Sequence, residues 1–306
     1  MPTLIFGHKN PDTDTICSAL VMADLQTKLG HEVKAVRLGS VNKETQFALD
    51  TFKMEAPDLI SEVMEGTEVI LVDHNEFGQS ADGIGSATIK MVVDHHRVSN
   101  FQTAEPLFMR VEPVGCTSTI LYKMYRENGV EISPAMAGMM TSAIVSDTLL
   151  FKSPTCTPED EKACRELAAI AGIDVDAYGL DMLKAGTDLS DYSAGQLLGI
   201  DAKIFPMGAS TVEIAQINTV SIEDMMSRKS ELESEMAAMI QSKSLNLFVA
   251  VITDILNSNS QVIALGDRTD LLEKGFKVTL DNNTALLEGV VSRKKQIVPV
   301  LDKVAK

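Results

Sequence analysis

Short apolar runs alternate with helix-like segments over the first half of the chain. Strand-length runs rich in Val, Ile and Leu are followed by segments in which apolar residues recur at helical spacing. This alternation is typical of βαβ units, which build parallel sheets. The predicted strands are 3–7, 33–38, 69–73 and 90–94. The predicted helices are Ser18 to Leu29, Asn42 to Phe52, a helix from Gly115–Thr119 to about Glu127, Pro134 to Leu150, and one with Thr157 as cap and Pro158 at its first position.

The pattern changes after a polar stretch, Thr187 to Ser193, that suits an interdomain linker. We expect a strand or bend over Ala194 to Lys203, a strand near Ile214–Ile217, and strands at 246–253 and 261–265. Ser221 to Lys243 is predicted to be one long amphipathic helix. Its inner, core-packing side would carry Ile222, Met225, Met226, Leu232, Met236, Met239 and Ile240.

These elements predict an α/β protein of two domains. An N-terminal parallel-sheet domain would span 1–187, a linker 188–194, and a smaller C-terminal α+β domain 195–306. The length of 306 residues agrees with two domains.

Composition narrows the functional classes. The net charge of −16 argues against broad nucleic-acid binding, which needs a basic surface. The longest apolar stretch, around 136–151, is too short for a membrane span and contains Asp147. A strand begins at Thr3 with no basic segment before it, so we expect no signal peptide. The four cysteines show no zinc spacing, which fits structural thiols in a reducing cytoplasm.

Acidic and histidine residues gather where the apolar runs end. The clusters are 8–14, 73–76, 94–96 and Asp147, and they contain four of the five histidines. Ligands bind at the carboxyl ends of parallel strands in open α/β sheets. Imidazole together with carboxylate suits manganese or cobalt better than calcium. A helix cap or turn explains any one of these aspartates equally well, but all four clusters together predict a two-metal hydrolase site.

Two of the clusters make more specific predictions. If the chain is extended at Pro11, Asp12 and Asp14 point the same way and can serve neighbouring metals. Two carboxylates about 4 Å apart repel by roughly 4 kcal/mol at an effective dielectric near 20, so converging aspartates need cations. Asp147 lies in a buried apolar helix, where a lone carboxylate would cost several kcal/mol, and a metal is its favoured partner.

The motifs also carry a family resemblance. GHKNPDTD at 7–14, VDHNE at 72–76, DHH at 94–96 and SDT at 146–148 resemble the DHH phosphoesterase superfamily. Within it, Ser292–Lys295 and Lys203 look like the family II inorganic pyrophosphatases. The resemblance implies a DHH domain followed by a DHHA2-type substrate-binding domain. It also implies a cytosolic, homodimeric enzyme that hydrolyses pyrophosphate to two phosphates by attack of a water shared between two Mn²⁺ or Co²⁺ ions.

The resemblance further implies a role for each site residue. His8, Asp12 and Asp73 would hold one metal, and Asp14, Asp73, His95 and Asp147 the other, with Asp73 bridging. His96, Lys203, Arg293 and Lys294 would bind the substrate, while Lys295 stays solvated. Asp94 and His74 would either orient the ligand imidazoles or contact substrate. Mg²⁺ is expected to arrive with pyrophosphate, because hard phosphate oxygens favour it.

Three alternatives stay open. An exonuclease or nano-RNase of the same superfamily would share the metal clusters, but it should carry a GGGH-type motif near its C-terminus, where this chain has Ser-Arg-Lys-Lys. A non-enzymatic module would use the clusters as a closed structural site. The start of the helix at Gly115–Thr119 suits either a plain cap or a phosphate contact.

Overall fold

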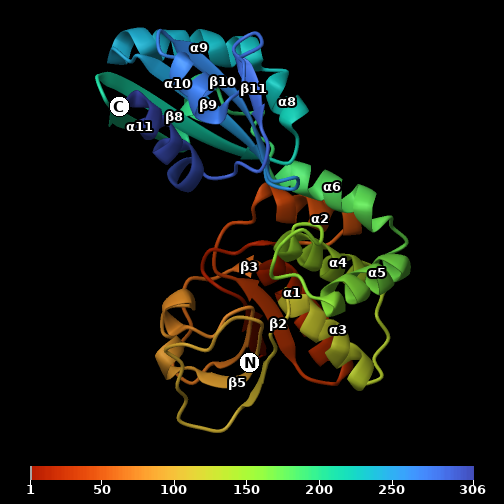
Figure 1. The fold of residues 1–306 in the computed structure, drawn as a ribbon. Helices are drawn as coiled ribbons and strands as arrows, with labels where there is room; N and C mark the ends of the chain where they lie inside the picture. The colour runs from red at the N-terminus through yellow and green to blue at the C-terminus, as the bar shows by residue number, and fades with distance from the viewer. Residues whose placement is uncertain (1) are drawn as a thin grey trace. The chain divides into compact units, whose positions relative to one another are not determined.

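The computed structural model describes residues 2–306, which form two compact units, 2–186 and Thr187–Lys306 (Figure 1). The first unit contains a six-stranded parallel sheet and the second a five-stranded mixed sheet. The α/β class expected from the alternating pattern is confirmed. None of the helices formed by residues 2–306 has both the length and the apolar character needed to cross a bilayer.

The sheet of the first unit has the order β3-β2-β1-β4-β5-β6. The four predicted strands are all present, and two short edge strands join them. The chain runs from β1 outward to β3 and then resumes on the other side of β1 with β4. The carboxyl ends of β1 and β4 therefore form the switch point at which open α/β sheets bind ligands. The strands are β1 Thr3–Phe6, β2 Val33–Arg37, β3 Asp58–Leu59, β4 Glu68–Val72, β5 Thr88–Asp94 and β6 Phe108–Val111.

Helices cover one face of this sheet. α1 and α3 contact the strands, and α4 packs behind them against α1, α3 and α5. Short 3-10 turns, η1 Phe77–Gln79 and η2 Ile84–Ser86, cover the other face with the segment 101–107. Figure 1 shows the helices gathered on one side of the first unit. The helices are α1 Thr13–Lys28, α2 Lys43–Phe52, α3 Thr117–Glu127, α4 Pro134–Thr148, α5 Pro158–Ala171 and α6 Val175–Gly186.

The start of α1 corrects one prediction. We expected an extended segment through Asp14 and a helix from Ser18, but the helix begins at Thr13. The reason is a cap that follows Pro11, since the Asp12 carboxylate accepts a hydrogen bond from Thr15 N at 3.0 Å. Asp14 consequently lies in the first helical turn, where side chains two residues apart do not face the same way.

The sheet of the second unit has the order β11-β10-β9-β8-β7. β8 and β9 are parallel, and the other neighbours are antiparallel. Alternate residues of β9 enter two separate cores: Val249 packs with α10 and α11, and Phe248 packs with α7, α8 and α9. The elements are α7 Ala194–Gly199, β7 Ala202–Met207, β8 Ser210–Thr219, α8 Ile222–Met226, α9 Lys229–Lys243, β9 Leu247–Asp254, β10 Asn259–Gly266, α10 Asp270–Phe276, β11 Thr284–Leu287, a π-helical turn Arg293–Ile297 and α11 Val298–Ala305.

Two predictions for the second unit were wrong. The segment 194–203 begins with a helix, α7, because Ser193 and Gln196 form a reciprocal capping box. The expected long helix is divided into α8 and α9 at Ser227–Arg228. There Ser227 Oγ donates to the carbonyl of Asp224, and the Arg228 guanidinium donates to the carbonyls of Leu189 and Tyr192. The methionine-rich side nevertheless packs in the core as predicted.

Candidate metal centre

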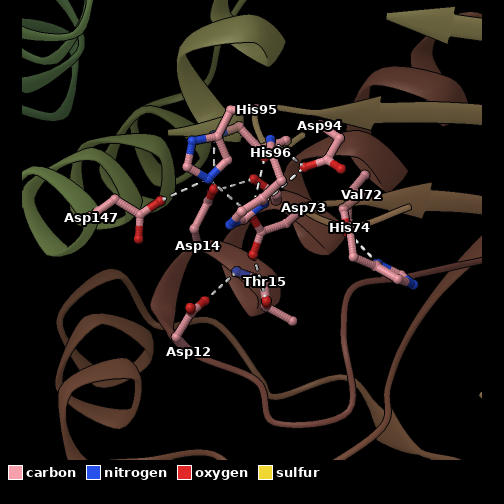
Figure 2. A network of polar contacts seen from close by, with 12 residues as sticks. Asp12, Asp14, Thr15, Val72, Asp73, His74, Asp94, His95, His96 and Asp147 are labelled. Atoms are coloured by element: carbon pink, nitrogen blue, oxygen red, sulfur yellow. Dashed lines mark hydrogen bonds and ion pairs between the residues drawn. The ribbon is translucent and has the colours of Figure 1, made fainter. Parts of the chain in front are cut away.

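The candidate ligands lie where strands and helices of the first unit end. His8 follows β1, Asp73 follows β4, and His95 follows β5, so three neighbouring strands deliver them to one edge of the sheet. Asp14 comes from the first turn of α1, and Asp147 from the last turn of α4. Figure 2 shows the side chains of Asp14, Asp73, His95 and Asp147 pointing toward one another.

Ligand atoms of His8, Asp12 and Asp73 form the first group, and all lie within 4.8 Å of one another. His8 Nε2 is 3.5 Å from Asp12 Oδ2 and 3.5 Å from Asp73 Oδ2. Burial tends to lower the pKa of His8, but the hydrogen bond to Asp12 and the surrounding carboxylates outweigh it and raise that pKa. The group offers one imidazole and two carboxylates to an ion.

Asp14, Asp73, His95 and Asp147 form the second group, again with ligand atoms within 4.8 Å of one another. His95 Nε2 lies 3.4 Å from Asp73 Oδ1 and 3.6 Å from Asp147 Oδ2. Its other ring nitrogen is 3.1 Å from the carbonyl of Val114. Such a hydrogen bond places the proton on Nδ1 and leaves Nε2 free for a metal.

Asp73 is shared by the two groups. Its Oδ2 faces His8 and its Oδ1 faces His95. Thr15 Oγ1 donates to Oδ2 at 2.6 Å, and Thr117 Oγ1 to Oδ1 at 3.3 Å, which holds the carboxylate plane. Its backbone has a φ of 57°, a left-handed conformation that costs a non-glycine residue about 1 kcal/mol or more and is typical of functional sites.

The raised pKa values of two of these aspartates, Asp73 and Asp147, indicate a shortage of positive charge around them. Burial, followed by the charge of Asp14, raises the pKa of Asp73 to about 7. The pKa of Asp147 is raised well above its ordinary value, again by burial and then by Asp14. His95 responds in the complementary way: burial lowers its pKa, but the Asp73 hydrogen bond and nearby carboxylates raise it to about 9. Buried, mutually repelling carboxylates beside imidazoles suit a divalent cation.

The remaining residues of the 73–76 and 94–96 motifs have different positions. Asp94 accepts from Asn75 Nδ2 at 2.6 Å and lies 3.0 Å from His96 Nδ1, so it orients the exposed His96 ring. His74 orients no other imidazole, because its two ring nitrogens are bonded to the Val72 carbonyl and to Ser80 Oγ. Neither residue therefore orients one of the proposed ligand imidazoles, His8 and His95, because Asp94 holds His96, which was expected to bind substrate.

An open cavity of about 430 Å³ lies over the ligands. Asp12, Asp73, His95 and Asp147 line it together with His96. Of its remaining lining residues, the sequence singled out Gly115, as part of a helix start, and gave no signal for Arg97, Val114 and Thr155. A closed structural metal site would leave no such space, whereas a catalytic site needs it.

The start of α3 resolves one open alternative. Its Thr117 N–H donates to Asp14 Oδ2 at 2.8 Å, and Ser118 Oγ donates to Asp14 Oδ1 at 3.1 Å. Ser18 Oγ donates to the same oxygen at 2.6 Å. These donors are used on a candidate ligand, so the helix start positions a carboxylate and does not present Thr117 N–H to a phosphate.

The cationic residues expected to bind substrate all lie in the second unit. Lys203 is exposed on β7, and Lys294 and Lys295 are exposed in the turn before α11. Arg293 is buried: its guanidinium donates to Asp201 Oδ1 at 2.7 Å and also to the Asp201 carbonyl. This contact brings the turn that carries Lys294 against the residue just before β7.

Comparison with known proteins places these residues in a family. The DHH family N-terminal domain matches residues 2–144, and the DHHA2 domain matches residues 180–304. A protein of Exiguobacterium sp. named as a probable manganese-dependent inorganic pyrophosphatase is 60% identical over 303 residues, 99% of this chain and 98% of the relative. One of the same name from Oceanobacillus iheyensis is 59% identical over 98% of this chain and 97% of the relative.

The chain belongs to the family II, manganese-dependent inorganic pyrophosphatases. A crystal structure of a Methanococcus jannaschii protein assigned to that family matches with a TM-score of 0.62 at 36% identity, and covers 100% of this chain and 99% of the other. The resemblance read from the four motifs is confirmed by these relatives.

Proposed function

We propose that this protein hydrolyses pyrophosphate to two phosphates at a two-metal centre formed by the first unit. The observation that carries the proposal is the pair of ligand groups that share Asp73 beneath an open cavity. The names of the relatives at about 60% identity support manganese as the metal and pyrophosphate as the substrate.

In this proposal His8, Asp12 and Asp73 hold one Mn²⁺ or Co²⁺, and Asp14, Asp73, His95 and Asp147 hold the other. When bound, such a pair of ions activates a water nucleophile near neutral pH and neutralises phosphate charge. The chain's own contribution is orientation. Thr15 and Thr117 fix Asp73, and the Val114 carbonyl fixes His95. In this proposal the exposed His96, which Asp94 holds and which lines the cavity, contacts the substrate.

We assign phosphate binding in the second unit to Lys203, Arg293 and Lys294. Arg293 offers a planar fork for two phosphate oxygens, whereas the lysines act as point charges. The Arg293 guanidinium is bonded to Asp201 in this structure. To bind a phosphate, Arg293 must therefore release Asp201. Mg²⁺ entering with the substrate would lower the charge that these residues must neutralise.

The cellular setting is also part of the proposal. We expect a cytoplasmic protein, which the four free cysteines support. We further expect a homodimer. The edge strand β6 supports it, because Phe108, Met109 and Val111 are 49%, 37% and 36% exposed on a sheet edge with room for another strand.

Phosphate release by Mn²⁺-loaded protein tests the activity. We expect phosphate from pyrophosphate, no products from a short oligonucleotide, and loss of activity on chelation. Release of mononucleotides without hydrolysis of pyrophosphate would instead support the exonuclease or nano-RNase alternative.

The metal assignment has its own test, in which bound Mn²⁺ is counted. His8→Ala and His95→Ala should each retain one tightly bound Mn²⁺ per chain where the parent protein retains two. Retention of both ions by either variant would refute the assignment.

A further inference from the structure

A buried carboxylate outside the ligand groups connects to them through a single loop. Asp160, in the first turn of α5, is 0% exposed. Its Oδ2 accepts from Gly115 N at 2.8 Å and from Thr157 N and Oγ1 at 2.8 and 2.6 Å. Its Oδ1 accepts from Thr119 Oγ1 at 2.6 Å. These donors are all neutral, so the charge of Asp160 is stabilised by hydrogen bonds.

Two of these bonds hold the ends of one short segment. Gly115 lies before α3 and Thr119 lies in its first turn, so Asp160 ties down the segment 114–119 from both sides. The bond from Thr157 N is part of the capping box of α5, and together with the bond from Thr157 Oγ1 it anchors the carboxylate itself. The segment is therefore fixed to α5 at the point where that helix begins.

The same segment contacts three candidate ligands. The Val114 carbonyl bonds His95 Nδ1, Thr117 N donates to Asp14, and Thr117 Oγ1 donates to Asp73. Gly115 also packs closely against Thr148, the residue that follows the fourth ligand, Asp147. A Cβ added to Gly115 would lie 3.0 Å from Thr148 Cγ2. Three of the four residues of the second group are thus bonded to this segment, and the fourth, Asp147, directly precedes a residue that packs against it.

The first group is held by other contacts. Asp12 is fixed by Thr15 N at the start of α1, and the oxygen of Asp73 that faces His8 is fixed by Thr15 Oγ1. A shift of segment 114–119 would move Asp14 and His95 and leave these contacts in place. Of the first group it would touch only Asp73, through the 3.3 Å bond from Thr117 Oγ1 to Oδ1, the oxygen that faces His95. The effect should fall on one ion of the pair.

We infer that Asp160 is a positioning residue for the metal held by Asp14, Asp73, His95 and Asp147, and that it acts through segment 114–119. It does not bind the ion. It sets the orientation of the His95 ring and the Asp14 carboxylate. The inference rests on the proposed metal assignment.

The test separates the two ions and then perturbs Asp160. In a His8→Ala background the remaining Mn²⁺ reports on the His95 group, and in a His95→Ala background it reports on the His8 group. Into each background we would introduce Thr119→Val, which removes the hydroxyl donor to Asp160 and keeps the shape of the side chain. Mn²⁺ affinity is measured by titration with detection of free Mn²⁺ by electron paramagnetic resonance.

We expect Thr119→Val to weaken Mn²⁺ binding about tenfold in the His8→Ala background. Losing a direct partner of a ligand weakens metal binding about 10- to 100-fold. Thr119 acts one contact further out, through Asp160, so the lower end of that range applies. In the His95→Ala background the affinity should change less than about twofold. Thr119→Ser, which keeps the hydroxyl, should restore binding. Asp160→Ala, if the variant folds, should weaken Mn²⁺ binding in the His8→Ala background more than Thr119→Val does.

A matched control distinguishes positioning from stability. Asp174 caps α6 by accepting from Asp176 N and Ala177 N, and it is exposed. Asp174→Ala should lower the melting temperature without altering Mn²⁺ affinity in either background. Unchanged affinity in Thr119→Val, or equal weakening in both backgrounds, would overturn the inference. If His8→Ala and His95→Ala each still bind two ions, the metal assignment fails and this inference fails with it.

Discussion

Many more contacts hold the candidate metal ligands of the first unit than hold the cationic residues of the second. Asp14 and Asp73 are 0% and 1% exposed, and each accepts hydrogen bonds from at least two other residues. Lys203 and Lys294 are exposed on a strand and a turn, and Arg293 is bonded mainly to Asp201. A preorganised site loses little entropy when it binds an ion, whereas exposed lysines must be ordered by the substrate. Substitution of a metal ligand in the first unit should therefore abolish activity, whereas substitution of a cationic residue in the second should only reduce it.

The largest effect is expected from Asp73→Asn. The variant removes the carboxylate that both ligand groups share, so turnover of pyrophosphate should fall by on the order of a thousandfold or more. The fold should survive, because an amide of the same shape replaces a buried carboxylate whose pKa is already raised to about 7. Circular dichroism checks the fold and phosphate release checks the rate. Near-normal hydrolysis by the folded variant would eliminate the shared-ligand role.

Metal removal should produce the next effect, on stability. With free Mn²⁺ about a hundred times its dissociation constant, each site should contribute on the order of 2.7 kcal/mol to the free energy of unfolding of the first unit. Chelation should therefore lower the melting temperature of that unit by several degrees, and Mn²⁺ should restore it. Elemental analysis confirms the loss of metal. An unchanged melting curve for the stripped protein would argue against a metal centre.

Arg293→Lys tests the proposed substrate-binding role of the second unit at its buried cationic residue. The variant keeps the charge but loses the planar fork, so the KM for pyrophosphate should rise about tenfold if one hydrogen bond to a charged group, about 1.5 kcal/mol, is lost. A lower kcat should accompany it. Mn²⁺ affinity should stay at the parent value, because Arg293 belongs to no ligand group. Parent-like kinetics, or loss of the metals, would assign Arg293 a different role.

The smallest effects, on the KM alone, come from a matched pair of neighbouring lysines. Lys294→Ala should raise the KM about tenfold by removing one charged phosphate contact, while Lys295→Ala should change it less than about twofold. Both side chains are exposed in the same turn, so their effects on folding should be equal. Equal kinetic effects would mean that the turn acts through its overall charge and that Lys294 has no specific contact.

Much of the first unit could be predicted because its signals are local. The strands of 3–7 and 69–73 are continuous apolar runs with polar ends, and Thr157–Pro158 carries its own helix start. Three candidate ligands, His8, Asp73 and His95, follow from strand ends by the rule for open sheets. The errors also have local causes. The Asp12 cap starts α1 early, and Ser227 with Arg228 interrupts a periodic apolar pattern that continues on both sides.

The sequence by itself determined the α/β class, the chemistry of the candidate ligands and their family, because residue type and periodicity carry that information directly. Only the tertiary structure decided which distant groups meet. Thr117 bonds Asp14 across a separation of 103 residues, Gly115 bonds Asp160 across 45, and Arg293 bonds Asp201 across 92. A hydrogen bond depends on two atoms lying about 3 Å apart in space. No spacing along the chain encodes that distance, so Asp160 and Asp201 gave no signal before the chain was folded.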